Sequence, residues 1–131
     1  MSIHLNKTNY VDKAEEVIKL LRVRNKNGKY MLKITTSKIR NLLSMVTELY
    51  NDVIHIPNDE LDEEMVQKIQ YLRLRIVYEA GRDPSVKEFI QKSGILNMVQ
   101  QIGNKKSTFL LFVNYMEALV AYHRFYSEED K

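Results

Sequence analysis

The stretch 107-STFLLFVNYMEALVAYHRFY-126 is apolar around most of its circumference when it is drawn as an α-helix. Asn114 and Glu117 are among the few polar side chains that interrupt it. A surface helix carries one apolar stripe, whereas a helix that is apolar on nearly every side is surrounded by other elements. We therefore predict that this helix is the central element of the fold and that the remaining helices pack around it.

Apolar residues at helical spacing predict four more helices. Three of them are expected at about 11–21, 37–54 and 61–81. The fourth should begin at Asp83-Pro84, which is typical of an N-cap followed by proline at the first helical position, and should bend or break at Ser93-Gly94. No run of alternating apolar and polar residues predicts a sheet, and a basic loop with Asn27-Gly28 is expected between the first two helices.

Length and composition are those of one folded domain. The 131 residues, 44% of them hydrophobic and 28% charged, suit a soluble globular protein with a single core. We predict one all-α domain over residues 1–131, a compact bundle of about five helices with its core at about 11–126 and short polar tails. The absence of cysteine suits a reducing compartment. Neither a signal-peptide core nor an apolar run of about 20 residues is present, which predicts a cytoplasmic protein without a membrane span.

Charge is distributed unevenly along the chain. Residues 17–47 contain eight basic side chains and no acidic one, whereas residues 48–64 contain seven acidic and no basic one. Residues 65–124 return to a basic excess, nine against four. Basic regions that flank an acidic loop suit a polyanionic partner combined with head-to-tail protein contacts.

The stretch 71-YLRLRIVYEAGRDP-84 places three arginines and two tyrosines close together. On a helix over residues 61–80, one arc is the apolar core face, formed by Leu61, Met65, Ile69, Leu72 and Ile76. The neighbouring arc carries a stripe of cations and aromatics, which consists of Lys68, Tyr71, Arg75 and Tyr78. Three interpretations of this stripe are open: arginines that lie over apolar edges, an intramolecular ion-pair network, or a phosphate-binding face.

Two predicted helix starts carry cations where the helix dipole disfavours them. Thr35-Thr36-Ser37 should cap the helix that begins near residue 37, and Lys38 and Arg40 follow in its first turn. Capping hydroxyls, free backbone N–H groups and two cations together make a site for an anion. Arg82 and Lys87 lie on either side of the next helix start in the same way. These positions favour the phosphate-binding interpretation.

No set of residues predicts catalysis or a cofactor. His4, His55 and His123 lie in a tail, a loop and a helix end, without a histidine or carboxylate at metal-ligand spacing. No nucleophile motif or glycine-rich phosphate loop is present. Glu79 and Glu117 lie near apolar arcs, where a carboxylate paired with an arginine such as Arg73 is a more common arrangement than a general base. We expect neither a metal, a cofactor nor enzymatic activity.

Three segments together resemble a known family, namely 34-ITTSKIRNLLSMV-46, 72-LRLRIVYEAGRDPSVKEFI-90 and 112-FVNYMEALVAYHRFY-126. In order and approximate spacing they resemble the small subunit of the type III-A CRISPR–Cas interference complex, the Csm complex. The resemblance implies a non-catalytic α-helical subunit of antiviral defence, present in several copies. It also implies the partners, which are guide RNA and target RNA, neighbouring copies of the chain, and the backbone and large subunits of the complex.

Positions that match the family's basic residues are implied to contact the guide–target RNA duplex, mainly its target strand. They are Lys38, Arg40, Arg73, Arg75, Arg82 and Lys87. Tyr71 and Tyr78 are expected to pack at the edge of the core rather than to stack on bases, because base stacking needs splayed single strands. Two other functions stay open: a sequence-specific DNA-binding helical domain and a helical adaptor that binds only proteins.

Overall fold

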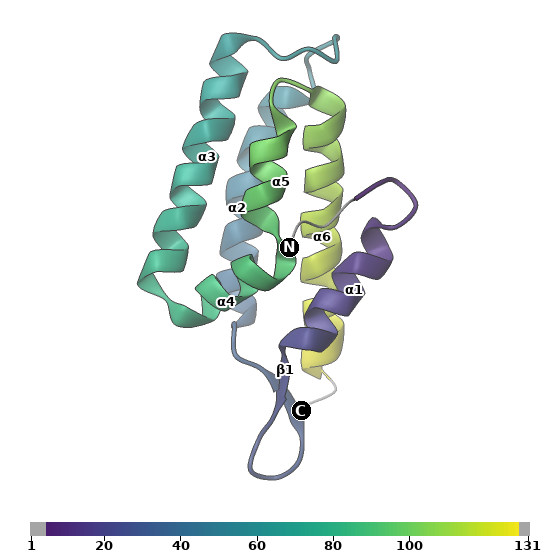
Figure 1. The fold of residues 1–131 in the computed structure, drawn as a ribbon, viewed down its shortest axis with the longest axis vertical. Coiled ribbons are helices and arrows are strands. Elements are labelled where there is room, and N and C mark those ends of the chain that lie inside the picture. The colour runs from purple at the N-terminus through teal and green to yellow at the C-terminus, as the bar shows by residue number, and fades with distance from the viewer. Residues whose placement is uncertain (1–4, 129–131) are drawn as a thin grey trace.

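Six helices make up most of the part of the chain that the computed structural model describes, residues 5–128 (Figure 1). They are Tyr10–Leu21 (α1), Thr36–Val53 (α2), Glu63–Arg82 (α3), Pro84–Ser93 (α4), Ile95–Ile102 (α5) and Lys106–Glu128 (α6). The prediction of an all-α bundle is confirmed. The additional helix arises at the expected break, because Gly94 ends α4 with φ 72°, a left-handed conformation that suits glycine. His4 and the end of the C-terminal tail lie outside the described residues.

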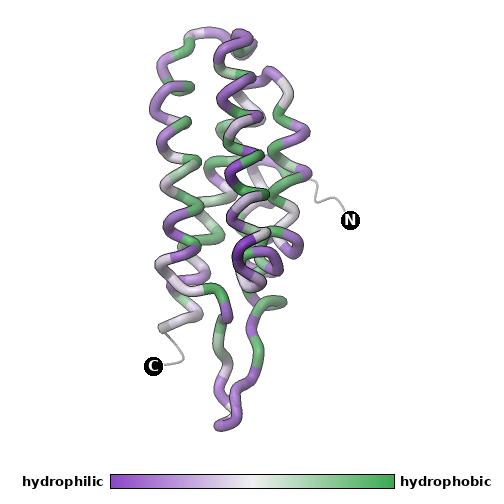
Figure 2. The backbone as a smooth tube through the Cα atoms, turned by 90° about the vertical axis from the view of Figure 1, so that its left-hand side faces the viewer, coloured by the Kyte–Doolittle hydropathy of each residue, from purple (hydrophilic) through white to green (hydrophobic). Residues whose placement is uncertain are grey.

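The central helix is α6, as predicted. It packs against α1, α2 and α5, and it buries side chains on several sides, among them Phe109, Phe112, Tyr115, Met116 and Leu119. Along the helices, hydrophobic residues recur between polar ones (Figure 2). The buried hydroxyl of Tyr115 donates a hydrogen bond to the backbone oxygen of Ser93, at 2.8 Å. This bond satisfies the hydroxyl and ties α6 to the break between α4 and α5.

The predicted caps at two helix starts are confirmed. At the start of α2, Thr35 Oγ1 accepts a hydrogen bond from the backbone N–H of Lys38, at 3.2 Å. At the start of α4, Asp83 Oδ1 accepts one from the backbone N–H of Ser85, at 2.9 Å, and Pro84 is the first helical residue. Each side chain satisfies an N–H group that has no partner inside its helix.

A short antiparallel hairpin takes the place of the loop expected between the first two helices. Strand β1 (Arg22–Arg24) pairs with β2 (Tyr30–Leu32), so the prediction that the chain has no sheet is wrong here. Strands of three residues are too short to show an alternating pattern. The turn between them decides the pairing: Asn25 Oδ1 accepts hydrogen bonds from two later backbone N–H groups, and Gly28 has φ 78°.

The connection between α2 and α3 is held against the start of α6. Asp59 Oδ1 accepts a hydrogen bond from the backbone N–H of Ser107, at 2.8 Å. The hydrogen bonds from Ser107 lower the pKa of Asp59, so the carboxylate stays charged at the N-terminus of α6, where the helix dipole favours it. The backbone N–H of Leu61 also donates to the oxygen of Asn104, at 2.7 Å. This acidic connection therefore has a fixed path.

Candidate nucleic-acid interface

The six predicted RNA-binding residues are distributed over α2, α3 and α4. They are Lys38, Arg40, Arg73, Arg75, Arg82 and Lys87. The structure brings Lys38 and Arg82 to one cleft, because α2 begins beside the corner between α3 and α4. Arg40 lines a different cleft, and Arg75 faces α2 farther along α3.

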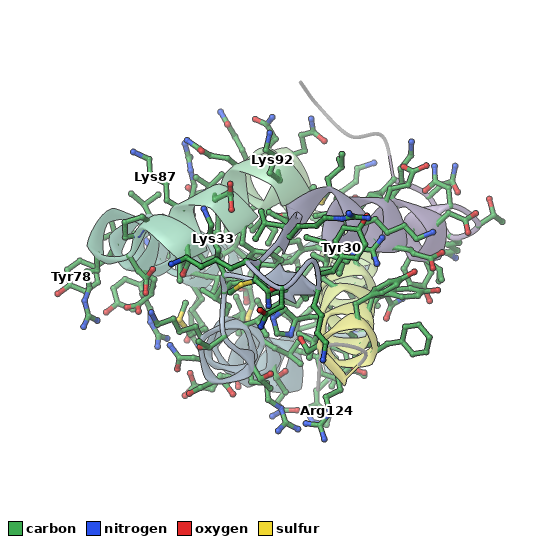
Figure 3. All side chains as sticks on the ribbon, turned by 90° about the horizontal axis from the view of Figure 1, so that it is seen from below. Tyr30, Lys33, Tyr78, Lys87, Lys92 and Arg124 are labelled. Atoms are coloured by element: carbon green, nitrogen blue, oxygen red, sulfur yellow. The ribbon has the colours of Figure 1, made fainter. Side chains whose placement is uncertain are left out.

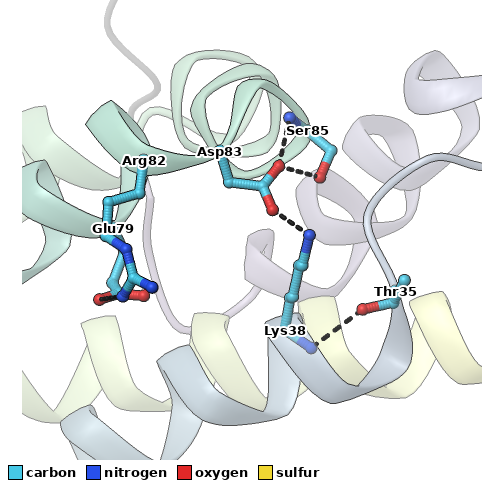
Figure 4. A network of polar contacts seen from close by, with 6 residues as sticks. All are labelled: Thr35, Lys38, Glu79, Arg82, Asp83 and Ser85. Atoms are coloured by element: carbon cyan, nitrogen blue, oxygen red, sulfur yellow. Dashed lines mark hydrogen bonds and ion pairs between the residues drawn. The ribbon is translucent and has the colours of Figure 1, made fainter.

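Lys38 and Arg82 line a cleft of about 550 Å³. Both cations have a carboxylate partner there (Figure 4). The Lys38 ammonium donates to the carboxylate of Asp83, and Arg82 Nη1 lies 3.4 Å from Glu79 Oε2. Glu79 is thus paired with Arg82 and not, as the sequence suggested, with Arg73. Two cations and two carboxylates balance each other, so an anion entering this cleft would compete with the protein's own carboxylates.

Asp83 joins two helices through one side chain. Its carboxylate caps α4 and also receives the ammonium of Lys38 from α2. The hydrogen bond from Lys38, followed by that from Ser85, holds the pKa of Asp83 well below its usual range. The carboxylate is therefore charged at neutral pH. In this structure, Lys38 forms an ion pair that connects the start of α2 to the start of α4.

Arg40 lies on the other side of α2, in a cleft of about 440 Å³ between α2 and α6. Arg124, near the end of α6, lines the same cleft, and none of the lining residues is acidic. Arg124 was not among the predicted residues, because the helix dipole alone explains a cation near a helix C-terminus. Two arginines from separate helices therefore line one cleft, and guanidinium groups are well suited to bind phosphate oxygens.

The imidazole of His123 forms part of the lining of the Arg40 cleft and is itself buried. Its Nε2 lies 2.7 Å from the backbone oxygen of Ile34, on the segment that leads into α2. Burial lowers the pKa of His123, so the ring is neutral at pH 7. This contact holds the end of α6 against the segment that leads into α2.

Stability should fall as the pH drops below about 6.5, the ordinary histidine value. Because the folded-state pKa of His123 is lowered, the unfolded chain takes up the proton first. The stabilisation that comes from neutral His123 is complete above about pH 6.5. As the pH falls from there toward the lower folded-state pKa, the free energy of unfolding decreases by up to about 1.4 kcal/mol per pH unit. Urea unfolding at pH 8 and pH 5.5 measures this. His123→Gln should remove this dependence of the free energy of unfolding on pH, and His55→Gln should keep it. If both variants lost the same free energy between pH 8 and pH 5.5, the assignment of the effect to His123 would be contradicted.

Exposed lysines gather at the end of the bundle where α2 starts and α6 finishes (Figure 3). Lys33 precedes α2, and Lys87 and Lys92 lie on α4. We define the basic end by its exposed cations, Lys33, Arg40, Lys87, Lys92 and Arg124. Lys33 could have been found from the sequence, because it belongs to the acid-free region 17–47. Lys92 lies in the last turn of α4, where a cation has no diagnostic value.

The stripe on α3 forms ion pairs with α2. Arg75 Nη1 lies 3.5 Å from Glu48 Oε2, and Lys68 Nζ lies 3.3 Å from Asp52 Oδ2. The geometry thus matches the ion-pair interpretation, one of the three that the sequence left open. Exposed pairs of this kind contribute only about 0–1 kcal/mol, so they stabilise the fold weakly. Arg73, on the same helix, has Nη1 3.5 Å from Gln70 Oε1.

Tyr71 and Tyr78 are exposed, and the prediction that they pack at the edge of the core is wrong. Their exposed fractions are 63% and 64%, and Leu74 and Val77 on the same helix are 62% and 46% exposed. We call these four residues the α3 patch. α3 lies on the outside of the bundle (Figure 1), so the neighbouring helices leave part of its surface uncovered. The periodicity of the sequence identified the buried face of α3. It did not show how much of the surface next to that face the neighbouring helices bury.

Within residues 5–128, the structure contains neither a metal-binding cluster nor a membrane-spanning helix. No three histidine or acidic side chains in this range are placed to share a metal ion. None of its helices is long and apolar enough to cross a membrane. Glu117 is exposed.

The chain is similar to known proteins of one family. The family model Csm2 Type III-A matches residues 11–129. A "CRISPR system Cms protein Csm2" from Streptococcus thermophilus is 44% identical over 96% of this chain and 98% of its own length. Proteins with the same name from Mycobacterium tuberculosis H37Rv and Enterococcus italicus are 36% and 38% identical, over 93% and 74% of this chain and 94% and 71% of their own lengths. The chain therefore belongs to the type III-A Csm2 family and is a Csm small subunit.

Proposed function

We propose that the chain is a non-catalytic, RNA-binding subunit of the type III-A CRISPR effector complex, which acts in antiviral defence in the cytoplasm. Its basic end contacts the phosphate backbone of the duplex between guide RNA and target RNA, mainly the target strand. Membership of the Csm2 family supports the place in the complex. The gathering of exposed cations at one end of the bundle is the observation that supports RNA contact.

Phosphate contact fits the chemistry of the basic end. Lysine and arginine side chains neutralise phosphates without reading base edges. Arg40 and Arg124 line one cleft, and Lys87 and Lys92 extend the positive surface over α4. In an RNA-guided complex, pairing with the guide supplies sequence specificity, so a subunit that ignores sequence is sufficient.

The α3 patch suits a protein partner. Adjacent exposed apolar side chains on a folded protein commonly mark interaction sites. Tyr71, Leu74 and Tyr78 also line a groove of about 500 Å³ with Asn41 and Met45 of α2, which a partner's side chains can enter. We propose that other parts of the complex, its backbone and large subunits or neighbouring copies of the chain, cover this surface.

The isolated chain should bind unrelated RNA oligomers weakly and with a strong dependence on salt. If about three phosphates are neutralised per chain, log K should fall with log salt at a slope of roughly −2 to −3. Filter-binding titrations at several salt concentrations measure the slope. Binding to RNA that ignores salt, or no binding at all, would favour the protein adaptor, and preference for one DNA sequence would favour the DNA-binding domain.

A further inference from the structure

The β1–β2 hairpin extends beyond the helices (Figures 1 and 2). Every residue from Arg24 to Met31 is exposed. Arg24, Lys26 and Lys29 fall in this range, and no residue in it is acidic. Since these side chains add nothing to the core, the fold alone does not require their charge.

The hairpin turn is ordered without the lysine side chains. The backbone N–H of Asn25 donates to the oxygen of Lys29 at 2.8 Å, and that of Gly28 donates to the oxygen of Asn25 at 3.0 Å. Asn25 Oδ1 accepts hydrogen bonds from the N–H groups of Asn27 and Lys29, at 2.9 and 3.1 Å. The ammonium groups of Lys26 and Lys29 take no part in these bonds, so they are available to a ligand on a preformed loop.

A row of cation–π contacts connects the hairpin to the bundle. The Arg22 guanidinium lies 4.5 Å from the centroid of the Tyr30 ring and 4.8 Å from that of Tyr126, which is buried on α6. Arg24 lies 5.1 Å from the Tyr30 centroid, on the exposed part of the hairpin. The row therefore begins in the core and ends in solvent with an arginine stacked on a tyrosine.

Three cations of the hairpin, Arg24, Lys26 and Lys29, have no carboxylate partner in the part of the chain that the structure describes. Among the carboxylates of residues 5–127, none forms an ion pair with any of these three side chains. This differs from Lys38, Arg75 and Arg82, each of which has a carboxylate partner. Like charges on one small projection, without a carboxylate partner among the described side chains, fit a polyanionic ligand.

We propose that the hairpin is a second RNA-binding site, separate from the basic end, that takes a single-stranded segment. Lys26 and Lys29 neutralise phosphates, and the arginine–tyrosine stack of Arg24 and Tyr30 supports an unpaired base. A cationic surface beside an aromatic side chain is the arrangement that single strands favour, because their bases are free to stack. The identity of the polyanion as RNA rests on the proposed function.

The test compares full-length chains for binding of a labelled single-stranded RNA of mixed sequence. At 0.1 M salt, each phosphate that the protein neutralises contributes about 0.7 log units to the binding constant for a single strand. The double change Lys26→Glu and Lys29→Glu should therefore weaken binding by about 25-fold and reduce the slope of log K against log salt by about 1.4. The control, Lys7→Glu with Lys105→Glu, changes the net charge equally before α1 and between α5 and α6. It should affect binding far less. Both double variants should melt like the wild type, because all four lysines are exposed.

Arg40→Glu with Lys87→Glu, measured in parallel, separates the two proposals. If this pair weakens binding and the hairpin pair does not, the hairpin site is wrong and the basic end stands. If neither pair weakens binding, the RNA contact proposed for the chain fails as well. An RNA duplex of the same length should depend less on Lys26 and Lys29 than the single strand does, and an equal dependence would overturn the single-strand assignment.

Discussion

Tyr115→Ala should lower the free energy of unfolding by about 4 kcal/mol, a large part of the roughly 5–15 kcal/mol that a domain of this size has. The Tyr115 side chain is fully buried at the centre of α6. Its removal leaves a cavity and deprives the backbone oxygen of Ser93 of its hydrogen bond. Chemical denaturation followed by circular dichroism measures the change.

Two matched variants identify the cause of that loss. Tyr115→Phe keeps the ring and removes only the hydroxyl, so it should cost about 1–2 kcal/mol. Tyr78→Ala removes the same side chain from the exposed α3 patch and should change stability by no more than about 0.5 kcal/mol. Equal costs at positions 115 and 78 would contradict the assignment of α6 as the central helix.

Arg40→Glu combined with Lys87→Glu should weaken target-RNA binding by reconstituted effector complexes by about 60-fold at 0.1 M salt. This estimate takes about 0.9 log units for each of two duplex phosphate contacts. Both residues are exposed at the basic end, so the melting temperature of the chain should barely move. The loss should be similar for every guide sequence, because phosphate contacts carry no sequence information.

The pair Lys7→Glu and Lys105→Glu again provides the control of equal charge. Arg75→Glu is a second useful comparison, because Arg75 faces Glu48 and not the basic end. It should reduce binding less than the change at Arg40 does. Wild-type affinity in complexes that contain the folded, incorporated Arg40 and Lys87 variant would remove the basic end from the RNA interface.

Helix periodicity and caps could be predicted from the sequence because their causes are local. Thr35 and Asp83 cap helices at the expected places, since a short polar side chain needs only the next few residues to bond. The hairpin could not be predicted in the same way. Its strands are three residues long, and a cation–π contact between Arg22 and Tyr126, about 100 residues away in the chain, helps to hold it.

The cations of the candidate site could be predicted from the sequence, but the side chains that lie next to each of them could not. The anion-site pattern at helix starts selected Lys38 and Arg40 alike, yet Lys38 meets Asp83 across 45 residues of sequence, whereas Arg40 meets a second arginine, Arg124. Such partners depend on which helices become neighbours. The exposure of Tyr71 and Tyr78 was missed for a related reason, since the depth to which neighbours cover a helix edge is a property of the assembled bundle.

The bonded connection between α2 and α3 has a consequence for the mechanics of the subunit. Because Asp59 and Leu61 are hydrogen-bonded to the α5–α6 corner and the start of α6, the longest stretch without helix between α2 and α6 cannot serve as a hinge. These bonds therefore oppose a movement of the α3 patch relative to the basic end. A rigid subunit loses less conformational entropy when it engages two partners at once, so a contact on one surface leaves the other already in position.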